Sequence, residues 1–141
     1  MMRIIAGEAH GRRLKAPRGL HTRPTSARAR ESIFSRLAVR MDLAGVRVLD
    51  IFAGSGSLGI ESLSRGASFV NFIDSSRDAA AAIRDNLAQL GLAGRSGPIL
   101  RALDKVAKIG RDGVVKELTS VGGEETPGAG LTPEKAEAVL A

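Results

Sequence analysis

The chain has 141 residues, a net charge of +6, and no cysteine, tryptophan or tyrosine. This length allows one domain with a modest core, and the missing cysteines exclude disulfides, thiolate zinc sites and thiol nucleophiles. No apolar run approaches the roughly 18 residues of a membrane span, and the start MMRIIAGE lacks the apolar region of a signal peptide. A cytoplasmic protein without a metal site is therefore expected.

The positive charge is concentrated in the first 40 residues. They contain ten Arg or Lys residues against two acids, whereas the remaining chain has 11 basic and 13 acidic residues. Nine of those ten are arginines, whose guanidinium groups make forked contacts to phosphate. A solvated basic face is one interpretation, but contact with a nucleic acid is favoured.

The N-terminal third predicts a hairpin and a helix. Residues 3–16 have two short apolar stretches with glycines between them, which favours a hairpin or a strand with a tight turn. A loop with two prolines follows over residues 17–26. Thr25 or Ser26 can cap a helix over residues 27–41. One face of that helix is apolar and the other carries Arg28, Arg36 and Arg40.

The middle of the chain predicts two strand–helix units. VRVLDIF, residues 46–52, is apolar enough for a buried parallel strand, and a helix over residues 57–64 ends before Gly66. A second strand covers residues 67–74. An alanine-rich helix over residues 75–92 ends near Gly91. A right-handed crossover makes these two strands parallel neighbours.

The C-terminal part predicts helices. Residues 98–118 show apolar residues at helical spacing with a break at Gly110, and residues 122–130 form a glycine-rich linker. Thr132 and Pro133 begin a short closing helix over residues 131–141. No third strand of the parallel sheet is evident.

The motif GxGxxG, formed by Gly54, Gly56 and Gly59, lies between the first predicted parallel strand and its helix. Such glycines let the backbone approach a ligand at a helix N-terminus. Asp50, before the loop, suits an ammonium group better than a pyrophosphate, and Asp74, after the second strand, can accept hydrogen bonds from ribose hydroxyls. These acids favour S-adenosylmethionine over a dinucleotide or a purely structural turn.

Several motifs resemble one known family. MRIIAGEAHGRRLKAP, TRPTSARARESIF, LDIFAGSGSLGIESLSRGA and FIDSS, within residues 2–93, are similar in sequence and order to bacterial 16S ribosomal RNA guanine-N2-methyltransferases. The resemblance implies a Rossmann-like fold with an N-terminal hairpin extension. It also implies methyl transfer from S-adenosylmethionine to a guanine amine in the small ribosomal subunit.

The resemblance also implies roles for individual residues. The cofactor would be held by Asp50, Gly54, Ser55, Gly56, Gly59 and Asp74. Ribosomal RNA phosphates would be contacted by Arg12, Arg13, Lys15, Arg23 and Arg28. Ala27 departs from the family, which usually has an aspartate there, and this could loosen the link between extension and cofactor pocket.

The catalytic motif of that family is missing from the chain. Its members orient the guanine amine with an Asn- or Asp-Pro-Pro-aromatic motif, but here no two prolines are adjacent and no aromatic residue follows Phe72. The sequence therefore predicts no catalytic residue and an inactive chain.

The C-terminal residues have a resemblance of their own. LRALDKVAKIGRDGVVKEL and GLTPEKAEAVLA resemble an internal helical segment of histidyl-tRNA synthetases, with an unrelated amphipathic tail as the alternative. The segment carries none of that family's ATP- or histidine-binding motifs. A chimera joined near residues 93–99 is the simplest account.

The expected fold is α/β: the N-terminal half of a Rossmann-like methyltransferase followed by an all-helical segment. The expected parts are a basic RNA-contacting extension (1–41), a partial cofactor-binding unit (42–93) and a synthetase-like helical segment (94–141). The alternative function is a folded, non-enzymatic chimera, natural or engineered, that retains some RNA or cofactor affinity, and a dinucleotide-binding module is a third. Because two strands leave both sheet edges exposed, a homo-oligomer with exchanged segments is also expected.

Overall fold

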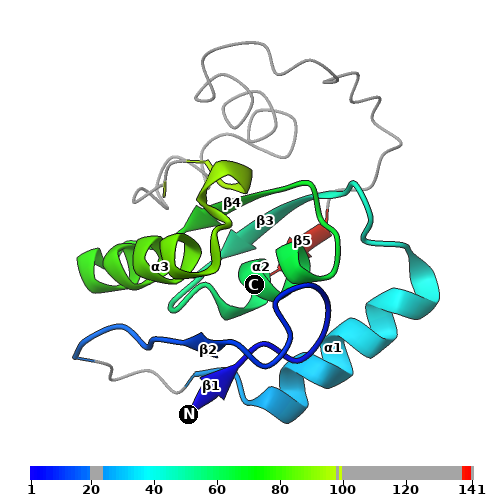
Figure 1. Cartoon of the computed structure of the whole chain (residues 1–141), viewed down its shortest axis with the longest axis horizontal. Helices are drawn as coiled ribbons and strands as arrows, with labels where there is room; N and C mark the ends of the chain where they lie inside the picture. Colours follow the sequence, from blue (N-terminus) through cyan, green and yellow to red (C-terminus); the bar gives the residue numbers. More distant parts are fainter. Residues whose placement is uncertain (20–23, 98, 100–137, 141) are drawn as a thin grey trace.

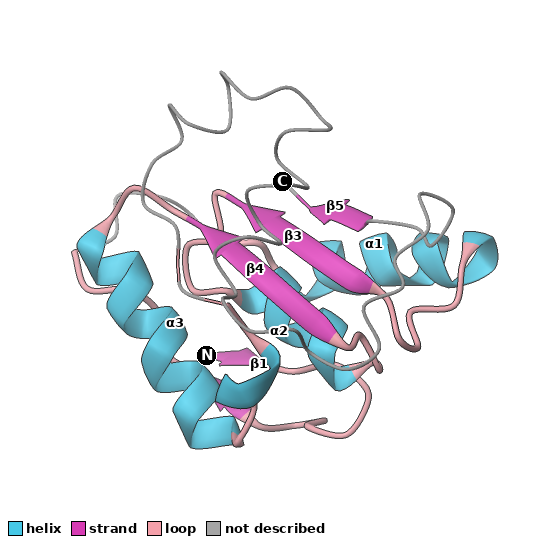
Figure 2. Cartoon of the chain, turned by 90° about the horizontal axis from the view of Figure 1, so that it is seen from above, coloured by secondary structure: helices cyan, strands magenta, loops and turns pink. Residues whose placement is uncertain are grey.

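The computed structural model describes residues 1–19, 24–97, 99 and 138–140. Its main sheet has the strand order β4–β3–β5, formed by β3 (Arg47–Ile51), β4 (Phe69–Ile73) and β5 (Ala138–Leu140). Figure 2 shows α3 (Arg77–Leu90) along the β4 side of this sheet and α1 (Ala27–Arg40) on the opposite side. The architecture is therefore mixed α/β, as predicted.

The two predicted strand–helix units are confirmed. β3 and β4 are parallel, with Arg47 opposite Phe69 and Ile51 opposite Ile73, and α2 (Ser57–Ser64) connects them. This is the arrangement that a right-handed crossover produces. It brings the carboxyl ends of both strands to the same edge of the sheet.

The helix ends follow local chemistry. Ser26 Oγ accepts a hydrogen bond from the Ala29 N–H at 3.1 Å, and Ser76 Oγ caps α3 in the same way through the Ala79 N–H. Each serine therefore satisfies an N–H group that has no partner within its helix. Gly91 ends α3 in a left-handed conformation with φ of 71°.

The expectation of a helix ending at residue 141 is wrong for residues 138–140. These residues form β5, parallel to β3, with Val48 opposite Ala138 and Asp50 opposite Leu140. The edge of β3 not used by β4 carries unpaired backbone groups, and pairing with β5 satisfies them. A tertiary partner has thus overridden local helix propensity.

The sequence shows no third parallel strand, and β5 contradicts this expectation. At the other edge of the sheet there is a single further backbone pairing. Ser96 forms a parallel bridge with Val70, and the Gly97 N–H donates to the Val70 carbonyl at 3.2 Å. After η1 (Ala93–Arg95) the chain therefore begins to pair with the outer edge of β4. Apart from Ile99, the predicted helices of residues 98–118, the linker of 122–130 and the first part, 131–137, of the closing helix lie outside the described residues.

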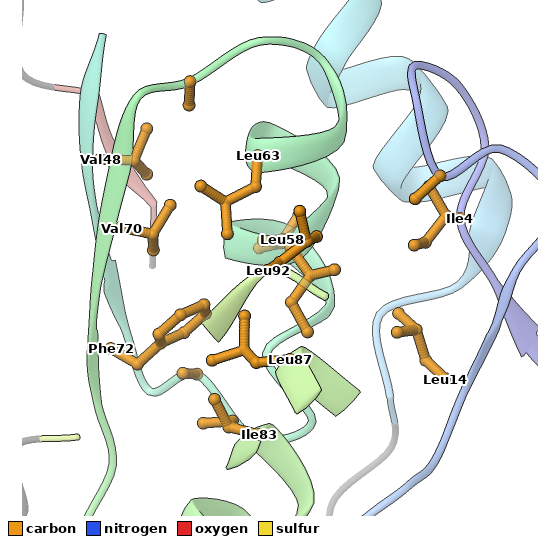
Figure 3. Packing of buried hydrophobic residues seen from close by; sticks show 14 of the residues in the cluster. Ile4, Leu14, Val48, Leu58, Leu63, Val70, Phe72, Ile83, Leu87 and Leu92 are labelled. Carbon is orange, nitrogen blue, oxygen red and sulfur yellow. The ribbon is translucent and has the colours of Figure 1, made fainter. Parts of the chain in front are cut away.

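One hydrophobic core joins the sheet, α2 and α3. In Figure 3, Val48, Val70 and Phe72 point from the strands toward leucines of α2 and toward Ile83 and Leu87 of α3. Burial of each such side chain contributes about 1.5–3 kcal/mol. The cluster continues on the far side of α2, where Ile4 and Leu14 come from the hairpin (Figure 3).

The N-terminal hairpin is built onto α2. Its strands are β1 (Met2–Arg3) and β2 (Arg13–Leu14), which pair antiparallel as predicted. The Glu61 carboxylate accepts hydrogen bonds from the Ile5 and Ala6 N–H groups at 2.9 and 3.0 Å, and Ser64 Oγ accepts one from the Ala9 N–H at 3.0 Å. Figure 1 shows the hairpin beneath α2, on the side away from the sheet.

Gly7 allows the hairpin to pack closely against α2. A Cβ atom at Gly7 would lie 1.8 Å from the Ser64 carbonyl oxygen, and its φ of 85° is one that other residues rarely adopt.

Among the helices described, none is long and apolar enough to cross a bilayer.

Candidate functional site: the glycine loop at the carboxyl ends of the strands

The glycine loop, residues 52–56, connects β3 to α2. The Ala53 N–H donates to the Ile73 carbonyl at 3.1 Å, and the Gly54 N–H donates to Asp74 Oδ2 at 2.8 Å. Both bonds fix the loop to the carboxyl end of β4. In open α/β sheets, ligands bind in the crevice at this end of the strands.

The three glycines of the motif have different surroundings. A Cβ at Gly54, whose φ is 57°, would meet no atom within 4 Å, so this glycine faces open space. A Cβ at Gly59 would lie 2.3 Å from Phe72 Cε1, so that glycine lets α2 pack against β4. Gly56, with φ of 76°, is buried near Ile83 at the start of α2. Of the three, only Gly54 has free space beside it.

Asp50 lies beneath the loop. Its Oδ2 accepts a hydrogen bond from the Gly59 N–H at 2.9 Å, and the residue is 1% exposed. Burial raises the pKa of Asp50 to about 7, although the Gly59 N–H opposes the rise and the charge of Asp74 adds to it. The carboxyl predicted to meet an ammonium group is thus buried and held by the backbone of α2.

Asp74 is partly exposed and closes the other side of the loop. Besides the Gly54 bond through Oδ2, its Oδ1 accepts a hydrogen bond from the Ser76 N–H at 2.9 Å. Each carboxylate oxygen keeps a second lone pair for a further donor. The structure therefore brings Asp74 and Gly54 together at the edge of the sheet.

Phe52 was not predicted as part of the site. It has a left-handed φ of 60°, unlike the other described non-glycine residues, and it is 67% exposed. Such a conformation costs of order 1–3 kcal/mol and is concentrated at functional sites. Nothing in the apolar run VLDIF separates this residue from a buried strand residue, so the sequence carried no signal for it.

Ser55 is held from below by Asn86, which was also not predicted. Asn86 is fully buried on α3, and its Nδ2 donates to the Ser55 carbonyl at 3.0 Å. Ser55 is itself buried, with Oγ 3.5 Å from the Met2 sulfur of the hairpin. The helical spacing of Asn86 from the buried Ala79 and Ile83 indicates that it is buried, but does not indicate which groups it binds.

The predicted RNA contacts lie on the hairpin and at the start of α1. Arg12, Arg13 and Lys15 are exposed near or on β2, and Arg28 is exposed in the first turn of α1. Figure 1 places that turn beside β1. The hairpin side chains rest on α3: Arg12 Nη2 donates to the Gln89 carbonyl at 2.9 Å, and Lys15 Nζ lies 3.6 Å from Asp85. Arg23 lies outside the described residues.

Arg30 does not belong to the exposed basic surface. It is fully buried, its Nη2 donates to the Arg3 carbonyl at 2.8 Å, and its Nε and Nη1 have no partner among the described residues. Burial lowers the pKa of Arg30, and the nearby Glu61 carboxylate opposes this. Of the ten basic residues among the first 40, Arg30 is therefore buried between α1 and the hairpin, where it cannot contact RNA.

The described residues contain no group of three or more His, Cys, Asp or Glu side chains that could hold a metal ion. Their polar groups at the glycine loop suit hydrogen bonding to an organic ligand instead. The loop, Asp74 and the basic hairpin are the features to compare with known proteins.

Comparison with known proteins gives a family for most of the chain. A family model described as "Conserved hypothetical protein 95" matches residues 2–113. "Putative rRNA methyltransferase YlbH" of Bacillus subtilis is 47% identical over 91 residues, which cover 64% of this chain and 48% of that protein. "Ribosomal RNA small subunit methyltransferase D" of Escherichia coli K12 is 42% identical over 89 residues, which cover 63% and 44%.

Solved structures agree with this result. The structure of "Putative methyltransferase yhhF from Escherichia coli" has a TM-score of 0.59 and 43% identity, covering 67% of this chain and 50% of that one. The chain thus spans about half the length of the curated relatives it matches. The methyltransferase resemblance and the Rossmann-like fold predicted for the N-terminal part are confirmed at this level.

The resemblance of the C-terminal residues to histidyl-tRNA synthetases also has a counterpart among known proteins. "Histidine--tRNA ligase" of Rhodopirellula baltica is 44% identical over 54 residues, which cover 38% of this chain and 11% of that protein. The match to the family model described as "Conserved hypothetical protein 95", in contrast, continues to residue 113, beyond the predicted junction.

Proposed function

The chain belongs to the family described as Conserved hypothetical protein 95, and we propose from this premise that its glycine loop binds S-adenosylmethionine. The observation that carries the proposal is the bond between the Gly54 N–H and Asp74 Oδ2 at the carboxyl ends of adjacent parallel strands. It fixes a glycine with free space beside a partly exposed carboxylate. These groups suit a ligand with ribose hydroxyls.

Each loop residue has a defined part in this proposal. Gly54 admits the ligand and Asp74 accepts hydrogen bonds. Asp50, whose pKa is about 7, is partly ionised near neutral pH, and in that form it supplies negative charge beneath the loop for an ammonium group. Ser55, Gly56 and Gly59 shape the loop rather than face the ligand, because all three are buried. S-adenosylmethionine, when bound, supplies an electrophilic methyl group, and these residues hold and orient it.

We further propose that the parent activity is methylation of a guanine N2 amine in 16S ribosomal RNA, carried out in the cytoplasm. The names of the relatives from Bacillus subtilis and Escherichia coli support ribosomal RNA as the substrate class. The exposed arginines of the hairpin are suited to phosphate contacts. The small ribosomal subunit is the corresponding partner.

We infer that the 141-residue chain itself transfers no methyl group, because it contains neither adjacent prolines nor an aromatic residue after Phe72. The chain would then be a recombined domain that keeps cofactor or RNA affinity. The similarity to a histidine–tRNA ligase supports a chimera, and we propose that its join lies near residues 93–99. Leu92 lies in the core and Ile99 packs against it, so the chain stays in contact with the N-terminal domain up to that point.

Calorimetry with S-adenosylhomocysteine tests the cofactor proposal. The chain should bind it with a Kd in the micromolar range and bind NAD more weakly, because Asp50 disfavours a pyrophosphate. Gly54→Val should abolish binding, since its side chain would occupy the space beside the loop. Tighter binding of NAD would support a dinucleotide-binding module instead.

Gly45→Val is the matched control. Gly45 also has a left-handed φ, 75°, with no atom near its Cβ position, but it lies in the turn before β3, at the opposite end of the strand. Both variants therefore carry the same backbone strain. Equal loss of binding in the two variants would contradict a ligand site at Gly54.

A further inference from the structure

The hairpin and the glycine loop meet at one buried side chain, Asn86. Its Oδ1 accepts a hydrogen bond from the Lys15 N–H at 2.8 Å, and its Nδ2 donates to the Lys15 and Ser55 carbonyls, both at 3.0 Å. All polar atoms of this amide side chain are thus used. Two of its bonds hold the hairpin, and the third holds the middle of the loop.

Ser55 is tied to the hairpin a second time. Its Oγ lies 3.5 Å from the sulfur of Met2, which belongs to β1. Lys15 follows β2 directly, so both strands of the hairpin end at contacts that lead to Ser55. The Gly56 N–H donates to the Ala53 carbonyl at 2.7 Å, which fixes the opposite side of the Ser55–Gly56 peptide.

We propose that Asn86 is a positioning residue that couples cofactor binding at the glycine loop to RNA binding at the hairpin. This rests on the proposed function of both segments. When the hairpin undocks, three buried groups lose the partners that the hairpin supplies: Asn86 Oδ1, Asn86 Nδ2 and Ser55 Oγ. A ligand that holds the loop in its docked form therefore stabilises the docked hairpin as well.

The link works in both directions. If S-adenosylmethionine raises the affinity of the hairpin for RNA by some factor, RNA raises the affinity of the loop for the cofactor by the same factor. Lys15 is placed to report this, because its backbone is bound to Asn86 while its side chain is exposed. The surface ion pair with Asp85 is weak enough to yield to a phosphate.

Amide hydrogen exchange with S-adenosylhomocysteine as the probe tests the coupling. In the unchanged protein, saturating probe should slow exchange at Gly54 and Gly56, and also slow it about fivefold or more at the hairpin amides of Ile4, Gly11 and Lys15. These hairpin amides are hydrogen-bonded to Arg12, Ile4 and Asn86 respectively. Protection of the loop without the hairpin would overturn the proposal before any variant is made.

Two variants then test whether Asn86 carries the coupling between the glycine loop and the hairpin. Asn86→Ala removes the amide, and Asn86→Leu removes it while keeping the volume of the side chain. In either folded variant the probe should still protect the loop but change hairpin exchange by less than about twofold. Persistence of the full hairpin effect in a folded variant would overturn the role of Asn86.

Ser64→Ala is the control. Ser64 Oγ also anchors the hairpin, through Ala6 and Ala9, but it does not touch the glycine loop. Loosening the hairpin there should raise its basal exchange while leaving the effect of the probe in place. If no residue is protected and calorimetry detects no binding, the cofactor proposal itself has failed, which is a different result from uncoupled protection.

Discussion

Asp50 is a buried acid whose ionisation opposes folding. Its pKa is raised from 3.8 to about 7, chiefly by burial, so the folded state holds its proton over a range in which the unfolded chain has lost it. Stability therefore falls as the pH rises from about 4 to about 7, and is constant with respect to this group above that range.

Asp50→Asn should remove this dependence. Asn Oδ1 can still accept the bond from the Gly59 N–H, and the variant carries no charge to bury. Between pH 5 and pH 8 the free energy of unfolding of the variant should rise relative to the unchanged protein by about 2–3 kcal/mol. Urea denaturation at both pH values measures it, and a difference independent of pH would contradict the buried position of Asp50.

The sequence predicts exposed and loop residues of the site better than buried polar ones. Asp74 and Gly54 were predicted from their places after a strand and in a glycine motif, and the structure brings them together. Arg30 and Asn86 were not singled out, because their partners are backbone groups 27 to 71 residues away. No local pattern encodes such distances.

At the scale of elements, α2 is the support for the hairpin. Glu61 is fully buried, and its two carboxylate oxygens accept the Ile5 and Ala6 N–H groups while Oε1 also accepts the Arg65 Nε–H at 2.9 Å. Three donors, from Ile5, Ala6 and Arg65, thus converge on the Glu61 carboxylate, whose two oxygens have lone pairs for all of them. The helix therefore carries both the end of the glycine loop and the base of the hairpin.

Glu61→Gln should lower the free energy of unfolding by about 2 kcal/mol, because an amide NH₂ group would then face a backbone donor. Urea denaturation measures this loss. The matched control is Glu8→Gln, since Glu8 is 54% exposed and pairs with Arg95. Its loss should be below about 1 kcal/mol. Equal losses would show that the buried carboxylate has no special part in docking.

The order of elements up to Gly91 follows from apolar periodicity and capping residues, and it is confirmed. The pairing of β5 with β3 could not be predicted in this way, since AVL is short and suits either a helix or a strand. Its partner lies about 90 residues earlier in the chain. Only the free edge of β3 in the folded domain decides between the two.

At the scale of the whole molecule, the basic hairpin should give salt-dependent binding to ribosomal RNA. Arg13→Gln should weaken binding to a 16S ribosomal RNA transcript and reduce the slope of log K against log salt by about 0.7–0.9, as expected for one lost phosphate contact. Filter binding at several salt concentrations measures this slope.

The matched control is Arg40→Gln. Arg40 is exposed at the C-terminal end of α1, away from the hairpin (Figure 1). This substitution removes the same charge and should leave the slope nearly unchanged. Equal effects of the two substitutions would indicate a diffuse attraction rather than contacts made by the hairpin.

The predicted homo-oligomer with exchanged segments rested on two exposed sheet edges. In the structure β5 pairs with one edge of β3, and Ser96 bridges the outer edge of β4, so part of that reason is removed. The oligomer stays a prediction. Sedimentation with only monomer at high concentration would contradict it.

Methyl transfer is the activity that the chain is expected to lack. We propose that the glycine loop holds the methyl donor, but an exocyclic guanine amine is a weak nucleophile because its lone pair is delocalised into the ring. Transfer to it needs a group that orients the amine beside the donor. The 141 residues contain no Asn- or Asp-Pro-Pro-aromatic motif for this task.

Labelled methyl from S-adenosylmethionine should therefore not enter small ribosomal subunits incubated with this chain, although S-adenosylhomocysteine should bind to it. The Escherichia coli relative supplies the positive control, since it is named a small subunit methyltransferase. Incorporation that disappears in Gly54→Val but persists in Gly45→Val would contradict the expectation. It would also mean that residues beyond Leu92 supply a different group to orient the guanine amine.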